Sequence, residues 1–180
     1  MIARLYGIKM KKRLFSLALA LLLAACVGKP DNITPVGQFE TAKYLGKWYE
    51  IARMDHSFEK GLSQVSAEYS LRDDGGLKVL NRGYNAANAK WKEAIGKAYF
   101  VGAPDQAYLK VSFFGPFYGS YIVFELDRDY RYSLVSGPDK SYFWLLSRSP
   151  KMDPATLQGL LAKAKALGFD TSKLIYVEQS

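Results

Sequence analysis

The stretch QVSAEYSLRDDGGLKVLNRGY, residues 64–84, has the pattern of a β-hairpin. Its first half alternates apolar and polar side chains, which is typical of a strand with one buried face. The sequence Asp-Asp-Gly-Gly at 73–76 then predicts a tight turn, because glycine adopts positive φ at little cost. Residues 77–84 return as the second strand, so this segment predicts antiparallel pairing.

Short runs of the same kind follow one another outward from this hairpin, each ended by turn residues. The further strands are predicted at residues 48–54, 93–101, 109–113, 121–126, 132–136 and 142–147. Their connections are too short to hold crossover helices, so neighbouring strands are expected to be antiparallel. Eight such strands can close into a barrel, which leaves no exposed edge. We therefore predict an all-β fold with one C-terminal helix, built as an eight-stranded antiparallel up-and-down barrel.

One segment near the C-terminus has a helical period instead. Asp153 and Pro154 suit the cap and the first position of a helix, and Gly168 suits its end. The apolar residues between them form one stripe at helical spacing: Leu157, Leu160, Leu161 and Ala164. We expect this helix to lie against the outside of the barrel. A short last strand is predicted at 175–177.

The net charge of the chain is +8, with 25 Lys plus Arg against 17 Asp plus Glu. Residues 1–25 hold five of the basic residues and none of the acids, so the rest of the chain carries 20 against 17. This small excess gives no reason to expect a nucleic-acid partner. The single Cys and single His exclude an intrachain disulfide and a metal site built from several such residues. No cofactor and no metal are therefore expected.

Residues 1–25 have the order of a secretory signal peptide, with basic residues, then an uncharged apolar run at 14–25 that ends in small residues. This run is too short to cross a bilayer as a helix, at about 1.5 Å per residue. Translation from Met1 and translation from Met10 both fit the pattern. Residues 23–26, Leu-Ala-Ala-Cys, resemble the lipobox of bacterial lipoproteins, which implies a lipid anchor at Cys26. Because Val27 rather than Asp follows, the resemblance implies the outer membrane, with the protein facing the periplasm.

These observations divide the chain into three parts. We expect a lipoprotein signal peptide at 1–25, a lipidated tether at 26–38 and a barrel domain at 39–180. The tether is inferred from its Pro, Asn and Gly residues, which are typical of linkers. Lipid attachment through two or more acyl chains would hold the protein stably at a membrane.

Two blocks of sequence resemble a known family. Residues 44–53, YLGKWYEIAR, resemble the Gly-x-Trp signature that opens the lipocalin fold, and residues 145–150, LLSRSP, resemble a conserved block near its end. Of the family's middle block, residues 126–128 keep only the Asp. The resemblance covers residues 39–179 and is closest to the bacterial outer-membrane lipoprotein lipocalins, with apolipoprotein D more distant. It implies a barrel floor, closed by an arginine stacked on a tryptophan as a cation–π pair, and places there Gly46, Trp48, Asp127 and Arg148.

In an eight-stranded barrel, alternate residues face a cavity that holds one small ligand. The inward faces, inferred from strand alternation and at some positions from similarity to apolipoprotein D, are mostly apolar. The predicted ligand-binding residues are Val65, Tyr69, Val79, Asn81, Leu109, Val111, Phe113, Tyr142 and Trp144. The resemblance implies a single-chain lipid as partner, a lysophospholipid or a fatty acid, which the protein stores or transports. The alternatives are a lipid-modifying envelope enzyme and a structural envelope lipoprotein without ligand.

Three further features bear on function. Glu50 has the strand parity of Trp48 and is expected to face inward, toward Arg148, water or ligand. The segment Asp55-His56-Ser57 has the residue types of a catalytic triad, but neighbours in an extended chain point apart, so no catalytic residues and no enzyme are expected. The apolar segment 113–118 is expected to fold over the barrel end, to touch lipid or to contact a second copy in a homodimer.

Overall fold

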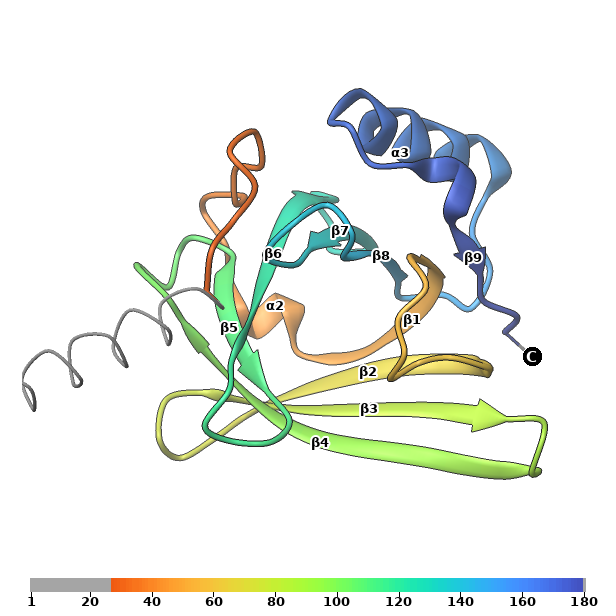
Figure 1. Cartoon of the computed structure of the whole chain (residues 1–180). Helices are drawn as coiled ribbons and strands as arrows, with labels where there is room; N and C mark the ends of the chain where they lie inside the picture. Colours follow the sequence, from red (N-terminus) through yellow and green to blue (C-terminus); the bar gives the residue numbers. More distant parts are fainter. Residues whose placement is uncertain (1–26, 180) are drawn as a thin grey trace, which may run out of the picture.

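Eight antiparallel strands close into a barrel in the computed structural model, which describes residues 27–179 (Figure 1). The strands are β1 (Gly46–Arg53), β2 (Leu62–Leu71), β3 (Leu77–Asn85), β4 (Lys90–Phe100), β5 (Tyr108–Ser112), β6 (Gly119–Leu126), β7 (Tyr132–Ser136) and β8 (Phe143–Ser147). Each strand pairs with the next along the chain, and β1 pairs with both β2 and β8, so the sheet closes on itself. The predicted eight-stranded up-and-down barrel with one C-terminal helix is confirmed.

The largest difference from the predicted strand limits is in β4, which begins at Lys90 rather than at residue 93. Residues 90–98 of β4 pair with β3, whereas the shorter β5 pairs only with residues 97–100. The β3–β4 hairpin therefore extends beyond the rest of the barrel wall, as Figure 1 shows.

The helix α3 (Pro154–Ala166) lies on the outer face of the barrel, as predicted (Figure 1). Asp153 caps it by accepting a hydrogen bond from the backbone N–H of Thr156 at 2.9 Å. The predicted stripe packs against outward-facing strand residues in one buried cluster, which includes Leu160, Leu161, Ala164, Ile122, Leu134, Phe143 and Leu145. A second buried cluster fills the inside of the barrel around Trp48. The core thus has two layers, one on each side of the sheet.

Short elements lie at both ends of the barrel domain. The helix α2 (Thr41–Tyr44) precedes β1, and a 3-10 helix (Thr171–Lys173) leads into β9 (Ile175–Tyr176). β2 pairs with β1 only up to Tyr49, and β9 pairs with β1 beyond that point, at Ala52 and Arg53. The C-terminal strand therefore covers the part of β1 that β2 leaves free.

Residues 27–38, which belong to the tether predicted at 26–38, lie packed along the barrel. Ile33 is fully buried, and the backbone of Val36 bonds to Ala107 and Val123 at 2.9–3.0 Å. The expected signal peptide at 1–25 and Cys26 lie outside the described residues. Within residues 27–179, no helix is both long and apolar enough to cross a membrane.

Candidate functional site

A cavity of about 590 Å³ occupies the inside of the barrel. All nine residues that the sequence predicted as ligand-binding line it: Val65, Tyr69, Val79, Asn81, Leu109, Val111, Phe113, Tyr142 and Trp144. At one end, which we call the mouth, its wall is completed by residues of three connecting loops, such as Phe58, Phe117 and Pro138. The lining is mostly apolar, as expected; that these residues bind a ligand stays a prediction.

Strand register explains why these side chains converge. Tyr69 pairs with Val79, and Ala67 pairs with Asn81, so each cross-strand pair projects to the same face of the sheet. Two buried polar atoms of the lining, Asn81 Oδ1 and Ser112 Oγ, have no hydrogen-bond partner among the described residues. Both atoms have almost no accessible surface, so the surrounding protein encloses them and the open cavity does not reach them.

Arg148 closes the end of the barrel opposite the mouth. Its guanidinium carbon lies 4.0 Å from the centroid of the Trp48 ring, the cation–π pair that the resemblance implied. It also donates four hydrogen bonds to backbone carbonyls, those of Lys43, Leu45 and Lys47 at 2.8 Å and that of Tyr130 at 3.3 Å. Gly46 has a φ of +87°, and a Cβ at this position would lie 3.5 Å from Arg148 Nη1. Gly46, Trp48 and Arg148 thus meet at the floor.

Asp127 supports the floor indirectly. Its carboxylate accepts hydrogen bonds from the side chain of Arg131 at 2.7 and 2.9 Å, and this guanidinium holds the pKa of Asp127 at about 2. Its carbonyl accepts a hydrogen bond from the backbone N–H of Tyr130 at 2.9 Å. Asp127 therefore shapes the β6–β7 turn, which presents the carbonyl of Tyr130 to Arg148.

A chain of hydroxyl groups crosses the cavity just above the floor. The hydroxyl of Tyr121 lies 2.7 Å from those of Tyr44 and Tyr69, and Tyr44 also contacts Ser133 Oγ at 3.3 Å. Burial raises the pKa of Tyr44 to about 12 and the pKa values of Tyr69 and Tyr121 well above their usual range. These groups are therefore neutral at physiological pH. Sequence reasoning identified only Tyr69, because the hydroxyls come from four distant elements.

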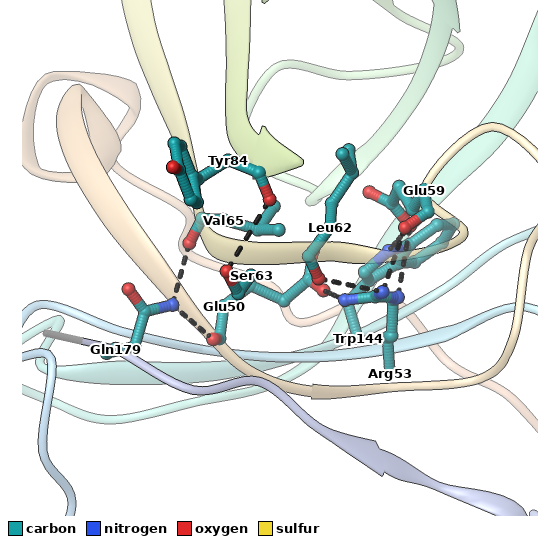
Figure 2. Close-up of polar contacts among 9 residues, drawn as sticks. All are labelled: Glu50, Arg53, Glu59, Leu62, Ser63, Val65, Tyr84, Trp144 and Gln179. Carbon is teal, nitrogen blue, oxygen red and sulfur yellow. Dashed lines mark hydrogen bonds and ion pairs between the residues drawn. The ribbon is translucent and has the colours of Figure 1, made fainter. Parts of the chain in front are cut away.

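A buried ion cluster lies in the wall of the cavity (Figure 2). Glu50 faces inward, as expected, but its partner is Arg53 (Oε1 to Nη1, 2.8 Å) and not Arg148. The guanidinium of Arg53 also donates to the carbonyls of Glu59 and Leu62 at 3.0 and 3.3 Å, and Trp144 Nε1 donates to Glu59 Oε2 at 3.1 Å. Sequence reasoning missed Arg53 and Glu59.

A β-bulge explains the Glu50–Arg53 pair. Residues three apart in a regular strand point to opposite faces. The register of β1 against β8 shifts between Glu50 and Ala52, so that both charged side chains face the inside. Two carboxyls then share one buried guanidinium. Burial and the neighbouring Glu59 raise the pKa of Glu50, and burial raises the pKa of Glu59, so the pair retains a proton more readily than free carboxyls do.

The C-terminus seals the wall beside this cluster. Gln179 Nε2 donates to the carbonyls of Glu50 and Val65 at 2.7 and 2.9 Å, which joins β1 to β2 where their direct pairing has ended (Figure 2). The backbone N–H of Gln64 donates to the carbonyl of Glu178 at 2.8 Å. This contact depends on the far end of the chain, and no local pattern signals it.

His56 packs among aromatic rings near the mouth. Its ring stacks on Tyr142 at 4.6 Å and on Phe58 at 5.2 Å between centroids, and Trp144 lies at 5.0 Å. Burial lowers its pKa, so the imidazole is neutral at physiological pH. Its Nε2 has no hydrogen-bond partner within residues 27–179. The imidazole thus serves as a packing surface in this arrangement.

Comparisons with known proteins agree with this geometry. A family model described as a lipocalin-like domain matches residues 39–179. An outer membrane lipoprotein Blc of Vibrio cholerae is 57% identical over 169 residues, which covers 93% of this chain and 99% of the relative. Blc of Escherichia coli K12 is 56% identical over 162 residues, with 89% and 92% covered. Apolipoprotein D of Mus musculus is 31% identical over 162 residues, with 86% and 84% covered.

Solved structures share the fold at lower identity. The cockroach allergen Per a 4 superposes with a TM-score of 0.66 at 20% identity, covering 86% of this chain and 96% of its own. Insecticyanin from the tobacco hornworm Manduca sexta also gives a TM-score of 0.66, at 23% identity over 84% of this chain and 86% of its own. These two likenesses bear on the fold alone.

Proposed function

The chain belongs to the lipocalin family, and from this premise we propose that it binds single-chain lipids in its barrel and stores or transports them at the outer membrane. The ligand class we propose is a lysophospholipid or a fatty acid. The relatives named outer membrane lipoprotein support the location, and a lipid attached to Cys26 would supply the anchor.

The observation that carries the proposal is the cavity of about 590 Å³ with its apolar wall. Its volume lies in the range of sites that enclose a small molecule, about 300–1,000 Å³. Each methylene moved from water into such a wall contributes roughly 0.8 kcal/mol. Ten buried methylenes would thus contribute about 8 kcal/mol, which corresponds to a micromolar complex before ordering costs are subtracted.

The polar groups of the cavity support an amphiphilic guest. Glu50 and Glu59, which share the guanidinium of Arg53, line one part of a wall that is otherwise mostly apolar. The hydroxyl chain around Tyr121 offers a second polar point near the floor. A lipid with one long chain and one polar group can meet both kinds of surface, whereas a fully polar ligand would leave the apolar wall without contacts.

Native mass spectrometry of the purified full chain tests the ligand class directly. We expect a co-purifying lipid of one acyl chain, which a fluorescent fatty acid displaces. Phe113 lies on the cavity wall. Phe113→Glu is expected to lower the affinity for the fluorescent fatty acid at least tenfold, because it places a charge against the acyl chain. Ile95→Glu is the matched control, since Ile95 is 61% exposed on the outside of β4. Circular dichroism verifies that both variants fold.

Other outcomes would contradict the proposal. An occluded barrel would give no bound lipid and no effect of Phe113→Glu, as expected of a structural lipoprotein. Turnover of added lysophospholipid that His56→Ala abolishes would indicate an enzyme instead. The anchor is tested separately: labelled palmitate is expected in the wild-type chain and not in Cys26→Ser, and the wild-type chain is expected in the outer-membrane fraction.

A further inference from the structure

Three exposed phenylalanines border the mouth of the cavity. Phe58, Phe114 and Phe117 line the cavity and are 60%, 77% and 62% exposed. They come from two loops, β1–β2 and β5–β6. Isolated exposed apolar side chains are ordinary, but these three form an apolar border that continues the cavity wall outward. We call them the mouth rim.

The β5–β6 loop differs in charge from two turns of the floor. The β5–β6 loop at the mouth, residues 113–118, contains no charged residue. At the floor, the β2–β3 turn holds the exposed ion pair Arg72–Asp74 at 2.6 Å, and the β6–β7 turn holds Asp127 and Arg131. Charged turns favour water, so the floor is suited to solvent, whereas the uncharged β5–β6 loop is suited to an apolar neighbour.

The N-terminal segment is held beside the mouth. The carbonyl of Gly28 accepts a hydrogen bond from Ser120 Oγ at 2.5 Å, and the carbonyl of Val27 accepts one from the hydroxyl of Tyr108. Ser120 is the second residue of β6 and lies three residues after Phe117, which corresponds to about 10 Å of extended chain. Cys26 precedes Gly28 by two residues, or at most about 7 Å. Acyl chains attached to Cys26 would therefore enter the bilayer close to the β5–β6 loop.

The apolar mouth rim and the position of the N-terminal segment are independent observations. From them we infer that the mouth rim is a membrane-docking surface, which contacts the membrane that holds the anchor. Lipids would then pass between the bilayer and the cavity without crossing water. This inference rests on the proposed anchor at Cys26. A loose tether of residues 26–38 would leave the orientation free, but the packed segment from Val27 onward removes that freedom.

Basic side chains next to the loop fit the same surface. The ammonium groups of Lys97 and Lys110 lie 6.0 and 5.2 Å from the centroid of the Tyr118 ring. Aromatic rings with cationic groups beside them suit the headgroup region, where rings meet the acyl boundary and ammonium groups meet lipid phosphates. The occupant is therefore the phospholipid surface itself.

Photo-crosslinking in cells tests the contact with the full chain. A benzophenone amino acid replaces Phe117 at the mouth or, as a matched control, Leu71, which is 67% exposed at the floor end of β2. We expect phospholipid adducts at 117 and several-fold fewer at 71. Equal adducts at both positions would overturn the inference. Adducts of 117 with a second copy of the chain would also overturn it and identify the mouth as a dimer interface.

A rate measurement, with the equilibrium affinity of each variant for the same lipid measured beside it, separates docking from binding. The full chain, held in vesicles of phosphatidylethanolamine and phosphatidylglycerol, takes up fluorescent lysophospholipid from the same bilayer. The double variant Phe114→Ser and Phe117→Ser is expected to slow uptake about tenfold or more, because two apolar membrane contacts are lost. Leu71→Ser is expected to leave the rate unchanged. An unchanged rate in the double variant would overturn the inference.

Different outcomes would contradict the proposed function and the docking surface. A chain that stays out of the membrane fraction, or that binds no lipid at equilibrium, contradicts the anchor or the binding proposal and removes the basis of the docking surface as well. A chain that is membrane-bound and lipid-loaded, yet gives no phospholipid adduct at 117, contradicts the docking surface alone.

Discussion

Replacing Arg148 by Ala tests what closes the barrel floor. The substitution removes two partly buried hydrogen bonds, to the carbonyls of Leu45 and Tyr130, and the stacking on Trp48. A charge-assisted hydrogen bond contributes about 1.5 kcal/mol or more, and the cation–π contact about 1 kcal/mol. The bonds to the exposed carbonyls of Lys43 and Lys47 add little, because water replaces them. We expect a loss of about 4 kcal/mol in the free energy of unfolding.

Urea unfolding followed by far-UV circular dichroism measures this loss, since fluorescence would also report the altered surroundings of Trp48. At about 2–4 °C per kcal/mol, the melting temperature is expected to fall by about 8–16 °C. Arg148→Lys keeps the charge but not the planar guanidinium with its several N–H donors. Its free energy of unfolding is expected to fall by about half as much as that of Arg148→Ala.

Arg82→Ala is the matched control. Arg82 also stacks on a tryptophan, 4.2 Å from the centroid of the Trp91 ring, and pairs with Glu93 at 3.4 Å, but it lies exposed on the β3–β4 hairpin. We expect Arg82→Ala to lower the free energy of unfolding by less than about 1 kcal/mol. Equal losses in Arg148→Ala and Arg82→Ala would refute the reasoning, because burial and carbonyl bonding would then contribute nothing.

The remaining predictions concern the ion cluster, the floor glycine and the helix cap. Because burial raises the pKa of Glu50, the folded protein keeps a proton that the unfolded chain loses above about pH 4.3, so this group lowers stability as pH rises. In Glu50→Gln, the urea midpoint should therefore decline less as the pH rises. An unchanged dependence of the midpoint on pH would contradict a proton retained by the Glu50–Glu59 pair. Gly46→Ala forces an L-residue into a φ of +87° and should cost about 1–2 kcal/mol. Gly159→Ala, in α3 with open space around it, should instead stabilise by about 0.5–1 kcal/mol, and equal effects would argue against backbone strain. Asp153→Ala removes the cap of α3 and should cost about 1 kcal/mol, read from the same midpoint.

Strand alternation predicts some side chains of the site and fails to predict others. Strand alternation placed all nine predicted residues on the cavity wall, because a period of two determines which side chains share a face. The same rule gives no sign that Arg53 faces inward beside Glu50, since the bulge after Glu50 reverses parity within β1. A bulge depends on the partner strand, so the alternation within β1 alone does not reveal it.

The sequence by itself determined the strands, their antiparallel order, the outer helix and the apolar character of the cavity wall, because each follows from residues close together in the chain. Tertiary structure decided the hydroxyl chain around Tyr121, the seal by Gln179 and the packing of residues 27–38 along the barrel. Those contacts join segments that lie far apart in the chain. They form only when the sheet has closed and brought these segments together, which no local pattern encodes.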